Sequence, residues 1–368
     1  IPGLKEKPDY WCQVTVPNEF QNVGNYNIGL TAGIETTTCD IEWVRGCNKM
    51  DLILTSSEHS KHVFQQSKYQ NSEKKDDIVE ITKPIEVLFE GGNLDIYKTI
   101  KKFENKELYN SINSMSEDFA YLVVGHWMQG NFGHDRKNIA LTVKSFYETF
   151  KNHKNPPALI LKTCRVSSSI VDKEVIQRKI DDIRDSIDGN TLPSVYLLHG
   201  EFTDKEMNEV YNHPKIKAMV SFTKGEGFGR PLLEFSLINK PIIASGWSGH
   251  LDFLHKDYVG LCGGTINNID KSAQVKGLLI EGAKWFDIDH SYINGLYNDV
   301  YENYEGWLER AKKQGKLSRK EFCFDAMTNK IKELFNKNLP ELPKKMELKL
   351  PGMDKIKMPK KNKLKIVK

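Results

Sequence analysis

Two glutamates in one short segment, residues 224–234, are well suited to binding a polar ligand. Seven residues separate Glu226 from Glu234, and Pro231 suits the first turn of a helix because the N–H that proline lacks would be unbonded there. Three glycines around the first glutamate let the backbone approach a ligand closely: Gly225, Gly227 and Gly229. Helix starts attract phosphate, and carboxylates accept hydrogen bonds from sugar hydroxyls. The segment therefore favours a nucleotide-sugar site, and an ordinary strand-to-helix turn with surface glutamates is the plainer alternative.

A second segment, residues 125–139, joins glycines to adjacent bases. A predicted strand ends at Gly125, and Arg136 and Lys137 stand at the start of the next predicted helix. Arginine offers a fork of donors to phosphate and lysine a point charge, whereas the helix dipole disfavours cations there. The two bases indicate a diphosphate clamp, with solvated first-turn residues as the alternative. Lys162 ends the following strand and is expected either to face the same crevice or to be merely exposed.

These segments fall in a region where strands and helices alternate. We expect strands over 120–125, 158–161, 194–199, 218–222 and 241–245, and helices over 138–151, 171–186, 204–212 and 231–239. Thr203 and Glu206 have the spacing of a capping box. This alternation predicts a parallel sheet covered on both faces, which binds ligands beyond the carboxyl ends of its strands.

The first part of the chain is also expected to be α/β. The predicted strands are 11–16 and 52–55, the predicted helices 40–48 and 58–66, and residues 67–80 form a polar loop. Asn18 and Glu19 follow the first strand, and Glu35 lies in a Gly- and Thr-rich loop, 29–38. We consider these three side chains for an acceptor side, with a turn and a surface loop as open alternatives. After Trp285 we expect helices over 292–314 and 320–336.

The segment 224–234 resembles the E-x7-E element of retaining GT-B glycosyltransferases, notably the GT4-like group, and the similarity continues through 241–252. This resemblance implies an α/β fold of two facing Rossmann-like domains with parallel sheets, and a final helix that returns to the first domain. It implies transfer of a sugar from a nucleoside diphosphate sugar to an acceptor hydroxyl, with retained configuration. No metal and no other cofactor is expected. The acceptor would be a carbohydrate, glycoprotein or glycolipid.

The resemblance also implies site residues. Arg136 and Lys137, with amides near Gly227, would stabilise the leaving diphosphate, Glu226 would bind a donor-sugar hydroxyl, and Glu234 the ribose. The donor-binding set is Gly125, Lys162, Glu226, Gly227, Phe228, Gly229 and Glu234. Lys224 could neutralise phosphate or pair with Glu226.

The domains expected from this resemblance are an acceptor-side domain over 1–95, an interdomain segment over 96–118, a donor-binding domain over 119–325, and a helix end with a Lys-rich tail over 326–368. Several strand-helix units normally precede the position of Trp11 in the family, so we expect the first domain to be partial.

Composition limits the other possibilities. A charged fraction of 28% with no apolar run of about 18 residues describes a globular chain without a membrane span, and we expect no signal peptide. Six scattered cysteines without a C-x-x-C pair favour reduced thiols, a cytoplasmic location and no zinc site. His59 and His62 lack a third ligand at metal-site spacing. A peripheral membrane location stays open.

The tail over 337–368 holds eleven lysines and three acids, which favours an acidic partner or a membrane surface. Because no aromatic residues interleave the lysines, nucleic acid is not the expected partner. Two other classes stay open. One is a non-catalytic nucleotide- or glycan-binding remnant of a GT-B protein, and the other is a nucleic-acid-modifying glycosyltransferase.

Overall fold

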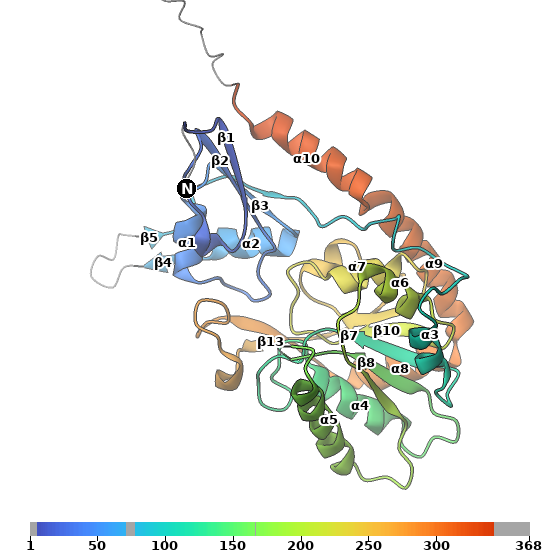
Figure 1. The fold of residues 1–368 in the computed structure, drawn as a ribbon. Helices are drawn as coiled ribbons and strands as arrows, with labels where there is room; N and C mark the ends of the chain where they lie inside the picture. The colour runs from blue at the N-terminus through green and yellow to red at the C-terminus, as the bar shows by residue number, and fades with distance from the viewer. Residues whose placement is uncertain (1–5, 71–77, 166, 342–368) are drawn as a thin grey trace, which may run out of the picture. The chain divides into compact units, whose positions relative to one another are not determined.

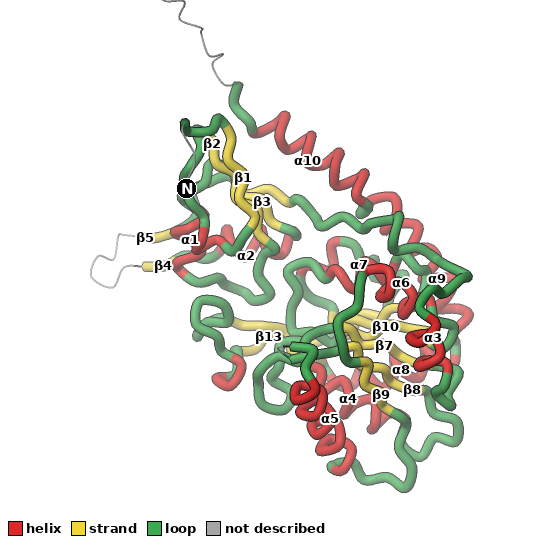
Figure 2. The backbone as a smooth tube through the Cα atoms, viewed as in Figure 1, coloured by secondary structure: helices red, strands yellow, loops and turns green. Residues whose placement is uncertain are grey.

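Two parallel sheets built from separate parts of the sequence form the framework of the protein (Figures 1 and 2). They are seen in a computed structural model that describes residues 6–70, 78–165 and 167–341. Residues up to Asn338 belong to one compact unit. The expected Lys-rich tail beyond residue 341 and the loop 71–77 lie outside the described residues. Within the part described, no helix is long and apolar enough to cross a membrane.

The first sheet has the order β1-β2-β3-β6, and all of its neighbouring strands are parallel. Its strands are β1 (Tyr10–Val14), β2 (Tyr26–Thr31), β3 (Leu52–Thr55) and β6 (Ile85–Val87). Two helices with side-chain caps pack on it, α1 (Ile41–Cys47) and α2 (Glu58–Gln66). The prediction of a loop from residue 29 was wrong in part, because residues 29–31 complete β2 and the loop begins after them.

The second sheet has the order β12-β11-β10-β7-β8-β9 and is also parallel throughout. Its strands are β7 (Ala120–Val124), β8 (Ala158–Lys162), β9 (Val195–Leu198), β10 (Ile216–Ser221), β11 (Ile242–Ser245) and β12 (Gly260–Cys262). The main helices are α4 (Ile139–Phe150), α5 (Ile170–Asp185), α6 (Asp204–Asn212) and α7 (Arg230–Ser236). The predicted alternation and the capping box before α6 are therefore confirmed.

The two faces of this sheet carry separate cores, as the apolar strands require. Tyr121 and Val123 of β7 pack with α4 and α5, while Leu122 between them packs with α6 and α7 on the other face. Figure 1 shows these two pairs of helices on opposite sides of the sheet. β7 and β10 are neighbours although they are far apart in the chain. The connections from these two strands therefore leave in opposite directions, toward β8 and toward β11. A crevice forms at such a switch point, at the carboxyl ends of the strands.

The remaining elements refine the predictions. The expected helix over 292–314 is divided at Asn303 into α8 (His290–Glu302) and α9 (Tyr304–Glu321), and α10 (Phe324–Asn338) follows. The sequence analysis did not predict β2 and β12 of the two parallel sheets. It also missed α3 (Lys106–Asn113), the pair β4 (Tyr69–Gln70) and β5 (Ile78–Val79), the pair β13 (Gly264–Asn268) and β14 (Lys284–Ile288), and the short turns η1 (Pro17–Glu19), η2 (Gly249–Asp252) and η3 (Lys271–Ala273).

The final helix, α10, contacts the first sheet, as the resemblance implied. Lys337 lies 2.6 Å from Glu86, and the hydroxyl of Tyr26 donates to the carbonyl of Asn338 over 3.0 Å. One charged and one neutral contact thus hold the end of α10 to two different strands of that sheet.

Candidate functional site

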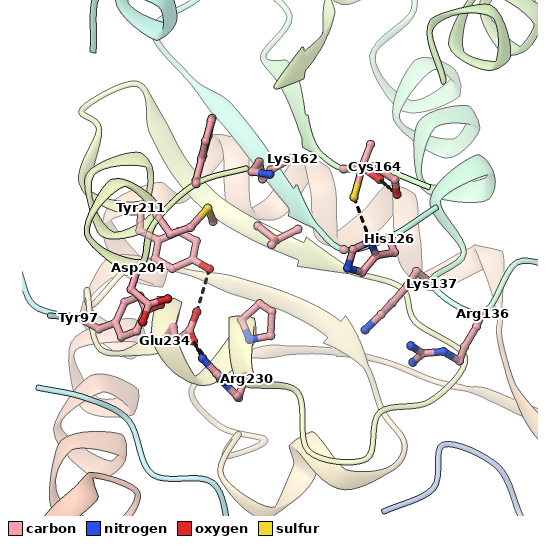
Figure 3. Close-up of a pocket in the computed structure, with 16 residues that line it drawn as sticks. Tyr97, His126, Arg136, Lys137, Lys162, Cys164, Asp204, Tyr211, Arg230 and Glu234 are labelled. Atoms are coloured by element: carbon pink, nitrogen blue, oxygen red, sulfur yellow. Dashed lines mark hydrogen bonds and ion pairs between the residues drawn. The ribbon is translucent and has the colours of Figure 1, made fainter. Parts of the chain in front are cut away.

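A cavity of about 440 Å³ opens at the carboxyl ends of β7 and β8 (Figure 3). The residues after β7, the start of α6 and the first turns of α7 surround it. Its lining is Tyr97, Val124, Gly125, His126, Arg136, Lys137, Lys162, Thr163, Cys164, Phe202, Asp204, Met207, Tyr211, Arg230, Pro231 and Glu234. The structure thus brings Gly125, Arg136, Lys137, Lys162 and Glu234, five of the predicted residues, to one cavity.

Glu234 lies at one end of the cavity with two partners (Figure 3). It accepts a hydrogen bond from the Tyr211 hydroxyl over 3.2 Å, and the guanidinium of Arg230 lies 3.3 Å from its other oxygen. Burial raises the pKa of Glu234 above its ordinary value, and Arg230 offsets this only in part. Glu234 is therefore an acceptor that a ligand with hydroxyl donors can use in place of these partners.

Lys137 and Arg136 lie at the other end and share a carboxylate outside the cavity lining. Lys137 makes a buried ion pair with Glu226, and Arg136 lies 3.9 Å from the second oxygen of Glu226. Burial opposes ionisation of Glu226, but the attraction of Lys137 and Arg136 is stronger, and the pKa of Glu226 falls below its ordinary value. Arg136 also lies 3.2 Å from Glu35 and donates to the carbonyl of Gly225 over 3.1 Å.

The cavity is electrostatically positive. Four cationic side chains line it against the two carboxylates of Asp204 and Glu234. The pKa of His126, in the same lining, is lowered first by burial and then by repulsion from Lys137, Lys162 and Arg136. An anionic ligand is therefore favoured at the end of the cavity that Arg136 and Lys137 line.

Lys162 points into the cavity but is already engaged. Its ammonium donates to the carbonyl of Gly200 over 2.7 Å and lies 4.5 Å from the ring centre of Phe202. Burial lowers its pKa. Of the two alternatives considered for Lys162, the structure supports the one in which it faces the crevice.

The glycines of the 224–234 segment approach protein backbone. A Cβ on Gly225 or Gly227 would overlap the carbonyl oxygens of Glu35 and Ala32. Gly229 has φ of 97° and stands at the N-cap of α7, where glycine is favoured. None of these three glycines, nor Phe228, is among the residues that line the described cavity. Phe228 is buried against Phe253, with ring centres 5.0 Å apart.

The other predicted side chains have different surroundings. Asn18 and Glu19 belong to the exposed turn η1, where Glu19 accepts from Thr15, and neither is in the cavity lining. Glu35 instead reaches Arg136. Lys224 does not pair with Glu226 as considered, because its buried ammonium pairs with the partly exposed carboxylate of Asp287.

Several cavity residues were missed by the sequence analysis. Arg230 stands four residues before Glu234, a spacing at which side chains meet on a helix, so this contact could have been foreseen. Tyr97, Tyr211 and Asp204 come from other elements and carry no such signal. Cys164 and His126 lie 3.1 Å apart across the ends of β8 and β7.

Neither a protein-family model nor a curated protein matches this chain. Solved structures do match in fold. Sucrose-phosphate synthase from Thermosynechococcus elongatus aligns at a TM-score of 0.59 with 10% identity, over 89% of this chain and 73% of that one. HepE from Anabaena, in complex with UDP and glucose, aligns at 0.58 with 13% identity, over 85% and 72%. A glycosyltransferase from Rickettsia africae aligns at 0.58 with 11% identity, over 86% and 71%. The chain therefore has the GT-B fold of glycosyltransferases.

Proposed function

We propose that this protein is a glycosyltransferase that moves a sugar from a nucleoside diphosphate sugar to an acceptor hydroxyl with retained configuration. The observation that carries the proposal is the cavity at the switch point of the second sheet. There Arg136 and Lys137 supply positive charge at one end, and Glu234 supplies a carboxylate at the other. A diphosphate requires this positive charge, and a ribose diol requires this carboxylate. HepE, a neighbour in fold, was solved with UDP and glucose.

In the proposed reaction the bond between the anomeric carbon and the diphosphate oxygen breaks, and the acceptor oxygen bonds to that carbon. The acceptor proton passes to the leaving diphosphate. Arg136 and Lys137 stabilise the charge that develops on the diphosphate, which is electrostatic catalysis without a protein nucleophile. Glu226 orients Lys137 and is assigned to a donor-sugar hydroxyl. We also keep Glu35, which lies 3.2 Å from Arg136, as an acceptor-side residue.

The test is a panel of UDP- and GDP-sugars, beginning with UDP-glucose, in which free sugar is measured without and with carbohydrate acceptors. Slow donor hydrolysis, lost in Glu234→Gln and kept in Glu309→Gln, is the expected result. Glu309 is exposed and pairs only with Lys312 among the described residues. NMR of the product anomer checks retention. Nucleotide binding without hydrolysis of any donor would favour the non-catalytic alternative.

A further inference from the structure

One end of the 440 Å³ cavity, here called the donor cavity, has no assigned partner in the proposed function. If Arg136 and Lys137 hold the diphosphate and Glu234 holds the ribose, the base of the nucleotide is left with the lining on the other side of Glu234. Figure 3 shows Asp204 and Tyr97 there, beside Glu234 and away from the two cationic residues. These side chains therefore determine which base is accepted, provided that the cavity binds a nucleotide sugar as proposed above.

Asp204 supplies an exposed carboxylate at this end of the donor cavity. It stands in the first turn of α6 and is part of the cavity lining. In the described part of the chain no lysine or arginine forms an ion pair with Asp204, whereas Arg230 pairs with Glu234. Burial, and then the charges of Glu234 and Asp204, raise the pKa of Tyr97, so its hydroxyl stays protonated and donates to Asp204. A carboxylate has about four acceptor positions, so most of those of Asp204 stay open to a ligand.

A smaller cavity, of about 260 Å³, adds negative charge at the same end. It shares Tyr97, Asp204, Arg230 and Glu234 with the donor cavity, and Glu90 is a third carboxylate in its lining. Arg230 is the one cation among the described residues that line it, so three acids face one base. This end is therefore opposite in charge to the end that holds the diphosphate in the proposed function.

The negative charge at this end favours a base that presents hydrogen-bond donors. An ionised carboxylate only accepts hydrogen bonds, so a carbonyl oxygen of the base that faced it would be repelled. Guanine has two adjacent donors on one edge, the ring N1–H and the exocyclic amine, and these match the two oxygens of a single carboxylate. Uracil has one N–H between two carbonyl oxygens, and adenine has one amine beside ring nitrogens that accept. Guanine therefore fits a lone carboxylate best.

We propose that Asp204 selects a guanine base, so that the donor of this protein is a guanosine diphosphate sugar. One oxygen of Asp204 accepts from the ring N1–H and the other from the exocyclic amine, while Glu234 binds the ribose. The smaller cavity adjoins Asp204 and leaves room for the larger ring system of a purine. A site that bonds a particular N–H discriminates against ligands that lack it, because its acceptor is then left without a partner.

Isothermal titration calorimetry of the full chain tests this with three nucleotides that share the ribose and the diphosphate: GDP, IDP and UDP. IDP differs from GDP only in lacking the exocyclic amine. Because a hydrogen bond to a charged group is lost in each comparison, we expect GDP to bind at least about fivefold more tightly than IDP and at least about tenfold more tightly than UDP. The comparison of GDP with IDP excludes the size of the ring system as the cause.

Asp204→Asn keeps the shape of the side chain and removes its charge. In this variant the affinity for GDP should fall at least about fivefold, its advantage over IDP should disappear, and the affinity for UDP should stay the same. Glu107→Gln is the matched control, because Glu107 is an exposed acid in the first turn of the capped helix α3 and lines neither cavity. It should leave all three affinities unchanged. Melting curves establish that both variants are folded, and the ranking of the three nucleotides on the unmodified chain tests the proposal without them.

Equal affinities for GDP and IDP, or UDP as the tightest ligand, would overturn the selection of guanine and leave the proposed transferase function standing. A loss in Asp204→Asn that is the same for all three nucleotides would also overturn it, because Asp204 would then bind the shared ribose. If none of the three nucleotides binds, the nucleotide site itself is refuted, and the proposed function with it.

Discussion

The buried ion pair of Lys137 and Glu226 allows structural and functional roles to be separated by one set of variants. Lys137→Met would leave the Glu226 carboxylate buried with Arg136 as its nearest remaining cation, 3.9 Å away. The two side chains of the pair are 15% and 10% exposed, so solvent screens the charge poorly. Removing one partner of a buried pair costs about 3–5 kcal/mol. Because Arg136 compensates in part, we expect a loss of about 3 kcal/mol in the free energy of unfolding.

The double variant Lys137→Met with Glu226→Gln removes both charges and should recover about 2 kcal/mol of that loss. Urea unfolding followed by circular dichroism measures these differences. Lys312→Met, which breaks an exposed pair, is the control and should cost at most about 1 kcal/mol. A double variant that is as unstable as Lys137→Met would show that the two charges are not coupled.

Nucleotide binding should respond differently from stability. If Lys137 binds the diphosphate, a charge-assisted hydrogen bond of about 1.5–3 kcal/mol is lost in both the single and the double variant. The affinity for UDP, measured by calorimetry, should then fall by about 10- to 150-fold in each. Affinity that returns to the wild-type value together with stability in the double variant would refute a direct role for Lys137. Lys137 would then have only a structural role, which is to pair with Glu226.

Three further outcomes follow from single sites. The affinity for UDP should rise as the pH rises through the elevated pKa of Glu234, since the ionised carboxylate accepts hydroxyl bonds, and Glu234→Gln should flatten the profile measured by calorimetry. In α9, Gly306→Ala should raise the free energy of unfolding by about 0.5–1 kcal/mol, because nothing lies within 4 Å of the new Cβ. Gly315→Ala in the same helix should lower it, because its Cβ would lie 2.7 Å from the carbonyl oxygen of Ser236. Thermal melting compares the two variants. Burial raises the pKa of Asp252 to about 6, so its ionisation lowers the stability of the fold as the pH rises from about 4 to 6. Asp252→Asn should therefore gain about 1 kcal/mol in the free energy of unfolding at pH 7.5 but not at pH 4, measured by urea unfolding.

The order of strands and helices around the second sheet could be predicted because its signals are local. Apolar runs such as residues 158–161 and the capping box at Thr203 depend on neighbours in sequence, and both were found where expected. β13 and β14 were missed since β13 is exposed along its whole length and carries no apolar pattern. The division between α8 and α9 at Asn303 has no proline or glycine to mark it.

The site was predicted by residue type, but not by partner. Nothing in the sequence indicated that the two glutamates of the 224–234 segment differ in pKa, yet the pKa of Glu226 is lowered and that of Glu234 is raised. Burial raises the pKa of both, but at Glu226 the attraction of Lys137 and Arg136 outweighs it, whereas at Glu234 Arg230 and Tyr211 offset it only in part. Among these partners only Arg230 stands at a helical spacing from its glutamate. Partners from distant parts of the chain depend on how whole helices and strands pack, so they cannot be inferred from the spacing of residues in the sequence.

The loop before α4 shows most clearly what the residue pattern leaves out. Two adjacent bases at a helix start indicated one anion site, and Arg136 and Lys137 do line a positive cavity. The next residue, Asn138, lines a different cavity of about 340 Å³, and Asp135 rather than Asn138 accepts a hydrogen bond from the N–H of Ile139. Three consecutive residues therefore line two different cavities.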